Sequence, residues 1–200
     1  MTYGPPHAEA TLRECLARGA HQAVHIVNGA TSLGDSFTIA KVLAAAIKDR
    51  PHDLILCGFK GVGTDNGQVG QMVAELLDRP HVANVTKLEV GEGSLTAGRE
   101  VEGGQEVVES PLPALVTCQK GLNEPRYAAL KGIMAAKRKP VEKVEVASLG
   151  VDEGADPFYA VRTVTLPPAK EEGTIIQGED DPAGAAAQLV KLLREDAKAI

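Results

Sequence analysis

The residues best suited to chemistry gather in one stretch, 53–78, where glycines alternate with Thr64, Asp65 and Asn66. Apolar residues 54–58 predict a strand buried on both faces, and apolar residues at helical spacing predict a helix after the turn: Val69, Met72, Val73, Leu76 and Leu77. A helix that begins after such a turn leaves its first backbone N–H groups, here over 68–71, without intrahelical partners. These groups attract an anion.

Two interpretations of this turn are open. In the first, Asp65 or Asn66 caps the helix and nothing binds. In the second, a nucleotide phosphate lies on the helix start, and Thr64, Asn66 and Gln68 add hydrogen bonds. Neither G-x-x-x-x-G-K-[ST] nor G-x-G-x-x-G occurs, so a bound nucleotide is held and not hydrolysed.

The sequence shows no catalytic constellation. Its three cysteines form no C-x-x-C motif, its five histidines lack metal-ligand spacing, and G-x-S-x-G is absent. We therefore expect no catalytic residue and no metal site. Cys57 and Cys118 are expected to be buried free thiols in apolar strands.

Composition indicates a soluble globular chain of one or two domains. The net charge of -6 argues against nucleic-acid binding, because phosphates are neutralised by clustered lysines and arginines. The sequence has neither a signal peptide nor an apolar run of membrane-spanning length, so we expect a cytoplasmic location and no membrane insertion.

The elements that position the turn alternate between strand and helix. Strands are expected at the start of the chain and over 23–27, 54–58 and 114–118. Helices are expected from about residue 8 to Gly19, and after a cap at Asp35 or Ser36, with five residues facing inward: Phe37, Ala40, Leu43, Ala44 and Ile47. Residues 85–110 read as antiparallel hairpins. We predict an α/β fold with a mostly parallel, doubly wound sheet, helices on both faces and an antiparallel hairpin excursion.

The segment 120–139 predicts a loop followed by a helix from about Arg126 to Lys137. Its apolar residues are either core, which is the default interpretation, or a face that docks a partner: Tyr127, Leu130, Ile133 and Met134.

The C-terminal part predicts an extended arm over 151–181, because it is rich in Pro, Gly and acidic residues. Asp181 and Pro182 then open a last helix with an apolar stripe: Ala186, Leu189, Val190, Leu193 and Ala197. We divide the chain into a nucleotide-binding α/β domain, 1–150, and an arm with a helix, 151–200, that packs on a partner subunit.

Three runs of the sequence resemble the β subunit of electron transfer flavoproteins. They are GPPHAEATLRECLARGA at 4–20, the turn TDNGQVG at 64–70, and LPALVTCQKGLNEPRYAALKGIMAAKRK at 112–139. The last is the most specific, and the similarity covers essentially all 200 residues.

The resemblance implies an electron-carrier subunit and not an enzyme. Such a subunit forms a heterodimer with an α subunit, which mainly holds the redox FAD, and carries electrons from flavoprotein dehydrogenases towards a quinone-linked acceptor. It further implies AMP in this chain, contacting Tyr3, Gly58, Thr64, Asp65, Asn66, Gly67, Gln68 and Val69. The docking residues would be Leu122, Asn123, Glu124, Pro125, Arg126, Tyr127 and Leu130, with Leu130 as the anchor, and Glu100 matches a position tied to mobility of the flavin domain.

Two features depart from the pattern of the family. The turn Gly63–Val69 is closer to members that hold a second FAD in place of AMP and bifurcate electrons from NADH. The family also has a central strand, a hairpin and a helix before the segment that matches residues 1–6. We therefore expect a shortened start that lacks at least one βα unit of roughly 30 residues. Its loss leaves strands without a neighbour and buried amides unsatisfied, at about 1–3 kcal/mol each.

A function of another class is an adenine-nucleotide-binding regulatory module without flavin or α partner. The 123–139 signature argues against it, since a nucleotide sensor has no need of that signature.

Overall fold

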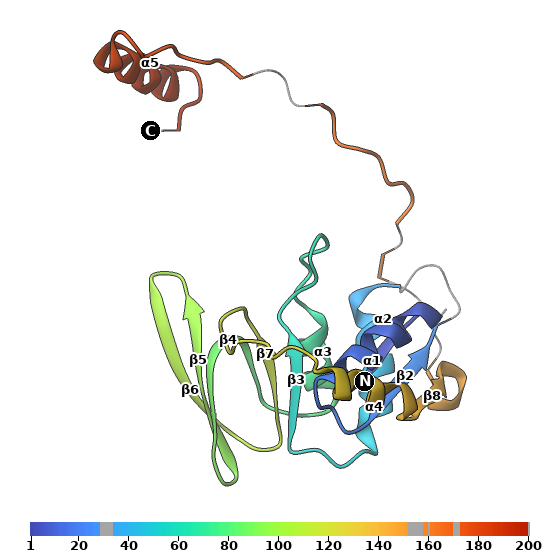
Figure 1. Ribbon diagram of the computed structural model, residues 1–200. Helices are drawn as coiled ribbons and strands as arrows, with labels where there is room; N and C mark the ends of the chain where they lie inside the picture. Colours follow the sequence, from blue (N-terminus) through green and yellow to red (C-terminus); the bar gives the residue numbers. More distant parts are fainter. Residues whose placement is uncertain (29–33, 152–157, 160, 170–172, 200) are drawn as a thin grey trace. The chain divides into compact units, whose positions relative to one another are not determined.

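Alternating strands and helices build the first of two units, residues 1–160; the second unit is residues 161–200. The computed structural model describes residues 1–28, 34–151, 158–159, 161–169 and 173–199. Residues 29–33 and parts of the predicted arm lie outside these residues. Figure 1 shows the elements in chain order.

A parallel sheet of three strands has the order β1-β2-β8, formed by β1 (Thr2–Gly4), β2 (Ala23–Val27) and β8 (Val141–Glu145). Short 3-10 helices, η1 (Pro6–Ala8) and η2 (Val146–Leu149), follow β1 and β8. The helices α1 (Glu9–Ala17) and α4 (Leu130–Arg138) pack against Ala23 of β2, and α2 (Ser36–Lys48) packs against Ile26. Because Ala23 and Ile26 point to opposite faces, helices cover both sides of this sheet. The strand β8 was not anticipated.

A sheet of five strands has the order β3-β7-β4-β5-β6. It consists of β3 (Leu54–Gly58), β7 (Ala114–Cys118), β4 (His81–Val90), β5 (Ser94–Val101) and β6 (Gly104–Pro111). The pairs β3–β7 and β7–β4 are parallel, whereas β4–β5 and β5–β6 are antiparallel. The expected α/β class, the mostly parallel pairing and the hairpin excursion are confirmed.

The helix α2 packs on both sheets. Its buried Val42 and Ala46 join the core of the three-stranded sheet, and Ala40 joins Leu115 of β7 and the buried residues of α3 (Val69–Leu76). As predicted, Asp35 caps α2 and accepts a hydrogen bond from the N–H of Thr38 at 2.7 Å. One helix therefore holds the two sheets together.

The strands β1 and β3 each lack a partner strand on one side, among the residues that the structure describes. The side chain of Leu56 in β3 is 56% exposed, whereas Leu115 and Val116 in the neighbouring β7 are fully buried. The prediction of a strand buried on both faces at 54–58 is therefore wrong in burial, although its limits are confirmed.

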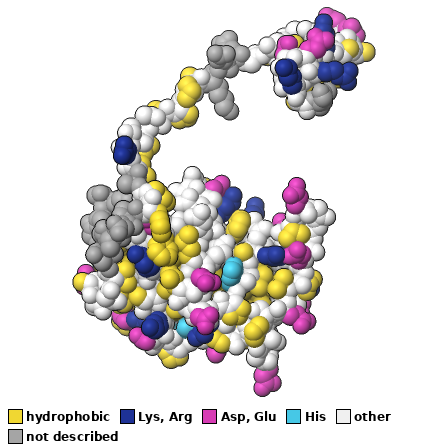
Figure 2. All heavy atoms as spheres, turned by 180° about the vertical axis from the view of Figure 1, so that it is seen from behind, with side chains coloured by type: hydrophobic (Ala, Val, Ile, Leu, Met, Phe, Trp, Pro, Cys, Tyr) yellow, Lys and Arg dark blue, Asp and Glu magenta, His cyan; other side chains and the backbone are white. Residues whose placement is uncertain are grey.

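The second unit is extended up to Asp181 over its described part, and ends in α5 (Pro182–Glu195). Asp181 caps this helix by accepting the N–H of Gly184 at 2.9 Å. Figure 2 shows hydrophobic side chains along the extended segment. Val164, Leu166 and Ile175 of this segment are exposed. The extended arm and the final helix are confirmed, although Ala197 of the predicted apolar stripe lies beyond the helix end. No residue of α5 is buried.

Candidate functional site

The turn between β3 and α3 leaves the start of α3 uncapped by any side chain. Gln68 occupies the cap position without a side-chain hydrogen bond, and the helix begins at Val69. The interpretation that Asp65 or Asn66 caps this helix is therefore wrong. Asp65 instead forms an ion pair with Lys60 at 3.1 Å and has a left-handed backbone conformation, with φ of +50°. The first-turn N–H groups thus point outward without a capping oxygen, as an anion site requires.

Asn66 connects this turn to the start of α2. Its Nδ2 donates a hydrogen bond to the Ser36 Oγ at 3.4 Å, and Ser36 is the first residue of α2. The N-terminal ends of α2 and α3 therefore lie near one another, at the carboxyl edge of the strands. This edge is where parallel α/β sheets bind their ligands.

Of the other predicted turn residues, Gly58, Thr64 and Gln68 are exposed, whereas Gly67 and Val69 are partly buried. A Cβ on Gly58 or Gly63 would meet nothing within 4 Å, so the backbone is open on that side. Thr64 and Gln68 offer hydrogen-bonding side chains, and Gly67 has φ of +56°, which glycine tolerates best. These donors fit an anionic phosphate, although the exposed Asp65 adds a negative charge that Lys60 offsets.

Tyr3 lies in β1, in the core under α2. It is 8% exposed, and its phenolic oxygen accepts a hydrogen bond from the Asn28 Nδ2 at 2.8 Å. Asn28 directly follows β2 and is itself buried. Tyr3 thus holds the carboxyl ends of β1 and β2 together.

The predicted docking segment is an exposed loop followed by a short helix. Residues 123–127 are exposed, Tyr127 at 95%, whereas Leu122 is partly buried against the core of the five-stranded sheet. The helix α4 begins at Leu130 and not near Arg126, so that prediction is wrong. Residues 123–127 are exposed, so a further helical turn there would gain no stabilisation from packing, on which a short helix depends more than on propensity.

The apolar residues of this segment face solvent. Leu130 is 77% exposed, Met134 50% and Ile133 40%, so the default interpretation of these residues as core is wrong. Leu130 and its neighbours form the exposed apolar surface that we call the α4 face: Tyr127, Leu130, Ile133 and Met134.

The opposite side of α4 is fixed against α1. Ala136 is buried with Leu12 and Leu16, and a Cβ on Gly132 would collide with the carbonyl oxygen of Ala17. Arg13 of α1 donates from its Nη1 to the carbonyl oxygen of Ala136 at 2.9 Å. A hollow of about 380 Å³ remains between the two helices. Sequence reasoning missed Arg13, since only the tertiary structure brings it to the end of α4.

Glu100 lies on β5 with an exposed side chain, and its backbone carbonyl accepts a hydrogen bond from the Asn84 Nδ2 at 3.1 Å. It is far in sequence from both the turn and the docking segment. Its predicted role in domain mobility stays a prediction.

The described residues contain no group of three or more His, Cys, Asp or Glu side chains that could hold a metal ion. Burial raises the pKa of the Cys57 thiol and of the Cys118 thiol, so both stay protonated and unreactive near neutral pH. The two thiols are free and half-buried, less buried than the sequence predicts.

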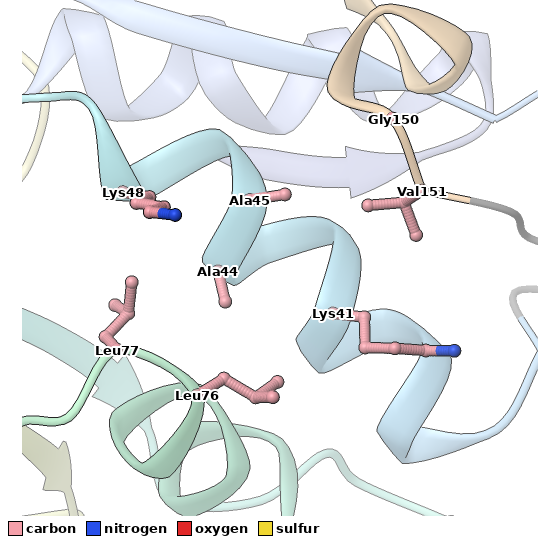
Figure 3. A pocket seen from close by; sticks show the side chains of 8 residues that line it. All are labelled: Lys41, Ala44, Ala45, Lys48, Leu76, Leu77, Gly150 and Val151. Atoms are coloured by element: carbon pink, nitrogen blue, oxygen red, sulfur yellow. The ribbon is translucent and has the colours of Figure 1, made fainter.

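A second hollow, of about 400 Å³, lies between α2, α3 and the chain after η2 (Figure 3). Ala44, Leu76 and Leu77 form its apolar wall, and Lys41 and Lys48 flank it. Leu76 and Leu77 stand at the C-terminal end of α3. The hollow is therefore separate from the turn and contains none of the predicted site residues.

The comparisons with known proteins agree with the resemblance. Residues 1–149 match the family described as "Electron transfer flavoprotein domain". The chain belongs to the electron transfer flavoprotein family. It is 45% identical to the "Electron transfer flavoprotein subunit beta" of Bacillus subtilis, over 100% of this chain and 78% of that protein. It thus shares the family's role in electron transfer.

Two further relatives come from other bacteria. The chain is 36% identical to the "Electron transfer flavoprotein subunit beta" of Syntrophomonas wolfei, over 98% of this chain and 73% of that protein. It is also 36% identical to the "Caffeyl-CoA reductase-Etf complex subunit CarD" of Acetobacterium woodii, over 96% of this chain and 76% of that protein.

None of the helices in the described residues has the length and apolar character needed to cross a membrane.

Proposed function

We propose that this chain is the β subunit of a heterodimeric electron transfer flavoprotein and performs no bond chemistry itself. The flavin supplies the redox chemistry, and the chain supplies a nucleotide site, a docking surface and an arm that packs on the α subunit. The heterodimer carries electrons from flavoprotein dehydrogenases to a quinone-linked acceptor.

The uncapped start of α3 is the observation that carries the nucleotide site. Its first-turn N–H groups bind the phosphate of AMP, and Thr64, Asn66 and Gln68 hold it from the turn. The Asn66 to Ser36 hydrogen bond supports this assignment, since it brings a second helix start to the same edge. Because the described turn has no Walker-type lysine motif that would transfer a phosphoryl group, the nucleotide is structural.

The α4 face supports the docking role. An apolar side chain that is 77% exposed, as Leu130 is, gains little stabilisation from burial in the isolated chain. It gains this stabilisation by inserting into an apolar pocket of a dehydrogenase, as interface anchors do. The rigid contact of α4 with α1 positions this anchor in advance, which lowers the entropic cost of docking.

A second candidate is a β subunit that holds a second FAD and accepts electrons from NADH. Two observations favour it: the turn sequence Gly63–Val69, and the similarity to a relative named as part of a caffeyl-CoA reductase-Etf complex. Family membership favours either candidate over a regulatory module without flavin.

Co-expression with the α subunit, followed by extraction of bound nucleotides, tests these proposals. One FAD and one AMP per heterodimer support the first candidate, and two FAD molecules support the second. An adenine nucleotide without flavin, or failure to bind an α subunit, contradicts both.

A further inference from the structure

Asn84 has a left-handed backbone conformation inside a strand, with φ of +62°. The register of β4 shifts there, relative to β7 between Val82 and Val85 and relative to β5 between Val85 and Lys87. Asn84 therefore occupies a bulge where β4 leaves its parallel partner and begins to pair with the hairpin. Asparagine adopts this conformation more readily than most residues with a side chain, and bulges of this kind are common next to functional sites.

Two hydrogen bonds hold Asn84, one on each side of β4. Its backbone N–H donates to the Thr117 Oγ1 of β7 at 3.0 Å, and its Nδ2 donates to the carbonyl oxygen of Glu100 in β5 at 3.1 Å. Its Oδ1 is buried and has no hydrogen-bond partner in the described part of the chain. Asn84 thus joins the parallel part of the sheet to the hairpin, and β7, β4 and β5 follow one another across it (Figure 1).

Thr117 in turn touches the start of α3. It is fully buried, and a Cβ on Gly70, in the first turn of α3, would lie only 2.7 Å from its Cγ2. The backbone of that turn therefore rests directly on Thr117. A displacement of the turn must move Thr117, and with it the hydroxyl that holds Asn84.

We propose that Asn84 is a positioning residue that couples the start of α3 to the Glu100 segment of the β5–β6 hairpin. The inference rests on the proposed nucleotide site, since phosphate on the first-turn amides is what fixes α3 against Thr117. Asn84 passes this constraint to the carbonyl of Glu100, so nucleotide occupancy sets the mobility of residues 99–105.

The variant Asn84→Gly separates this role from a structural one. Glycine adopts the left-handed conformation without strain, so the bulge persists, but the carboxamide that holds Glu100 is lost. Thr86→Val is the matched control. Thr86 also donates from β4 to a β5 carbonyl, that of Gly98 at 3.4 Å, but through a bond that does not involve Thr117.

Hydrogen exchange of the amides at 99–105 is measured in the complex with the α subunit, with AMP bound and after its removal, and with FAD as a second probe. We expect nucleotide to slow this exchange at least about threefold in the wild type and in Thr86→Val, but not in Asn84→Gly, whose AMP affinity stays within about twofold. A nucleotide effect that persists in Asn84→Gly, or is absent from a wild type that binds nucleotide, overturns the coupling.

An experiment without any ligand keeps the test of the coupling separate from the proposed nucleotide site. Thr117→Val keeps the methyl group that contacts α3 and removes the acceptor of the Asn84 N–H. As a single substitution, Thr117→Val should speed hydrogen exchange of the amides at 99–105. Combined with Asn84→Gly, it should cause no further change in that exchange. Equal hydrogen exchange at 99–105 in Thr117→Val and in the wild type overturns the coupling, whether or not the chain binds a nucleotide. A wild type that binds neither AMP nor FAD, with the Thr117→Val effect intact, overturns the nucleotide assignment and with it the role of occupancy.

Discussion

The Asp35 carboxylate binds the backbone of Phe158, 123 residues further along the chain: its Oδ2 accepts the Phe158 N–H at 2.5 Å. Its other oxygen, Oδ1, caps α2 through Thr38. The ring of Phe158 also packs on that of Phe37, with centroids 5.2 Å apart. One buried carboxylate therefore fixes both the start of α2 and the point where the C-terminal arm leaves the domain.

We expect Asp35→Ala to lower the free energy of unfolding by about 1–2 kcal/mol, because the cap of α2 is lost. It should also speed proteolysis of the chain after Phe158, since the backbone anchor is lost with it. Asp35→Asn is the matched control, because asparagine caps helices about as well as aspartate. Unfolding in urea and limited proteolysis measure the two effects. An Asp35→Ala variant with wild-type proteolysis would show that the arm is held elsewhere.

Stability should depend on pH through the same residue. The hydrogen bond from the Thr38 N–H, with help from that of Phe158 and against the effect of burial, lowers the pKa of the Asp35 carboxyl from its ordinary 3.8. Its contribution is fully present above that value and is lost as the pH falls through the lower pKa of the folded state. The difference in unfolding free energy between wild type and Asp35→Asn should therefore be constant from neutral pH to about 5 and shrink below about 4. A constant difference down to pH 2 contradicts this.

Leu130→Ala should weaken reduction by the dehydrogenase and leave the nucleotide content unchanged. Loss of one anchor side chain costs about 1.4 kcal/mol or more, which corresponds to about a tenfold fall in kcat/KM. Val107→Ala is the control, since Val107 is 75% exposed on β6, away from the α4 face. Wild-type reduction kinetics in Leu130→Ala would remove the docking role.

Gly132→Ala should displace α4 from α1 and destabilise the domain by about 1–3 kcal/mol, because the new methyl group meets the backbone carbonyl of Ala17, which cannot turn away. Gly104→Ala, where a Cβ meets nothing within 4 Å, is the control. Thermal unfolding of both variants checks this. If binding to the dehydrogenase and stability both fall in Gly132→Ala but not in Gly104→Ala, the α1–α4 contact positions the anchor Leu130.

The open edge of β3 should be visible in hydrogen exchange of the isolated chain. We expect amides of β3 that face away from β7 to exchange at least about tenfold faster than those of β7, which lies between β3 and β4. Equal protection in the two strands would mean that another segment covers this edge in solution.

Much of the fold follows from local pattern. The limits of 23–27, 54–58 and 114–118 are read directly from short apolar runs between turns, and Asp35 is recognisable as a cap because it precedes a helical pattern. The glycine-rich turn and the hairpins follow from equally local signals. Each depends on interactions within a few residues, which the sequence displays.

Other features exist only through contacts between distant residues. The seating of α4 on α1 depends on Gly132 meeting Ala17, and the exposure of Leu56 depends on which strands pair with β3. The bonds from Asp35 to Phe158 and from Asn84 to Thr117 and Glu100 join positions that share no local pattern. Periodicity shows which apolar residues share one face of a helix or strand, but the elements that pack against that face decide whether those residues are buried. The sequence alone therefore determined most of the elements, the turn and the family, and the tertiary structure decided which apolar surfaces are left to bind a partner.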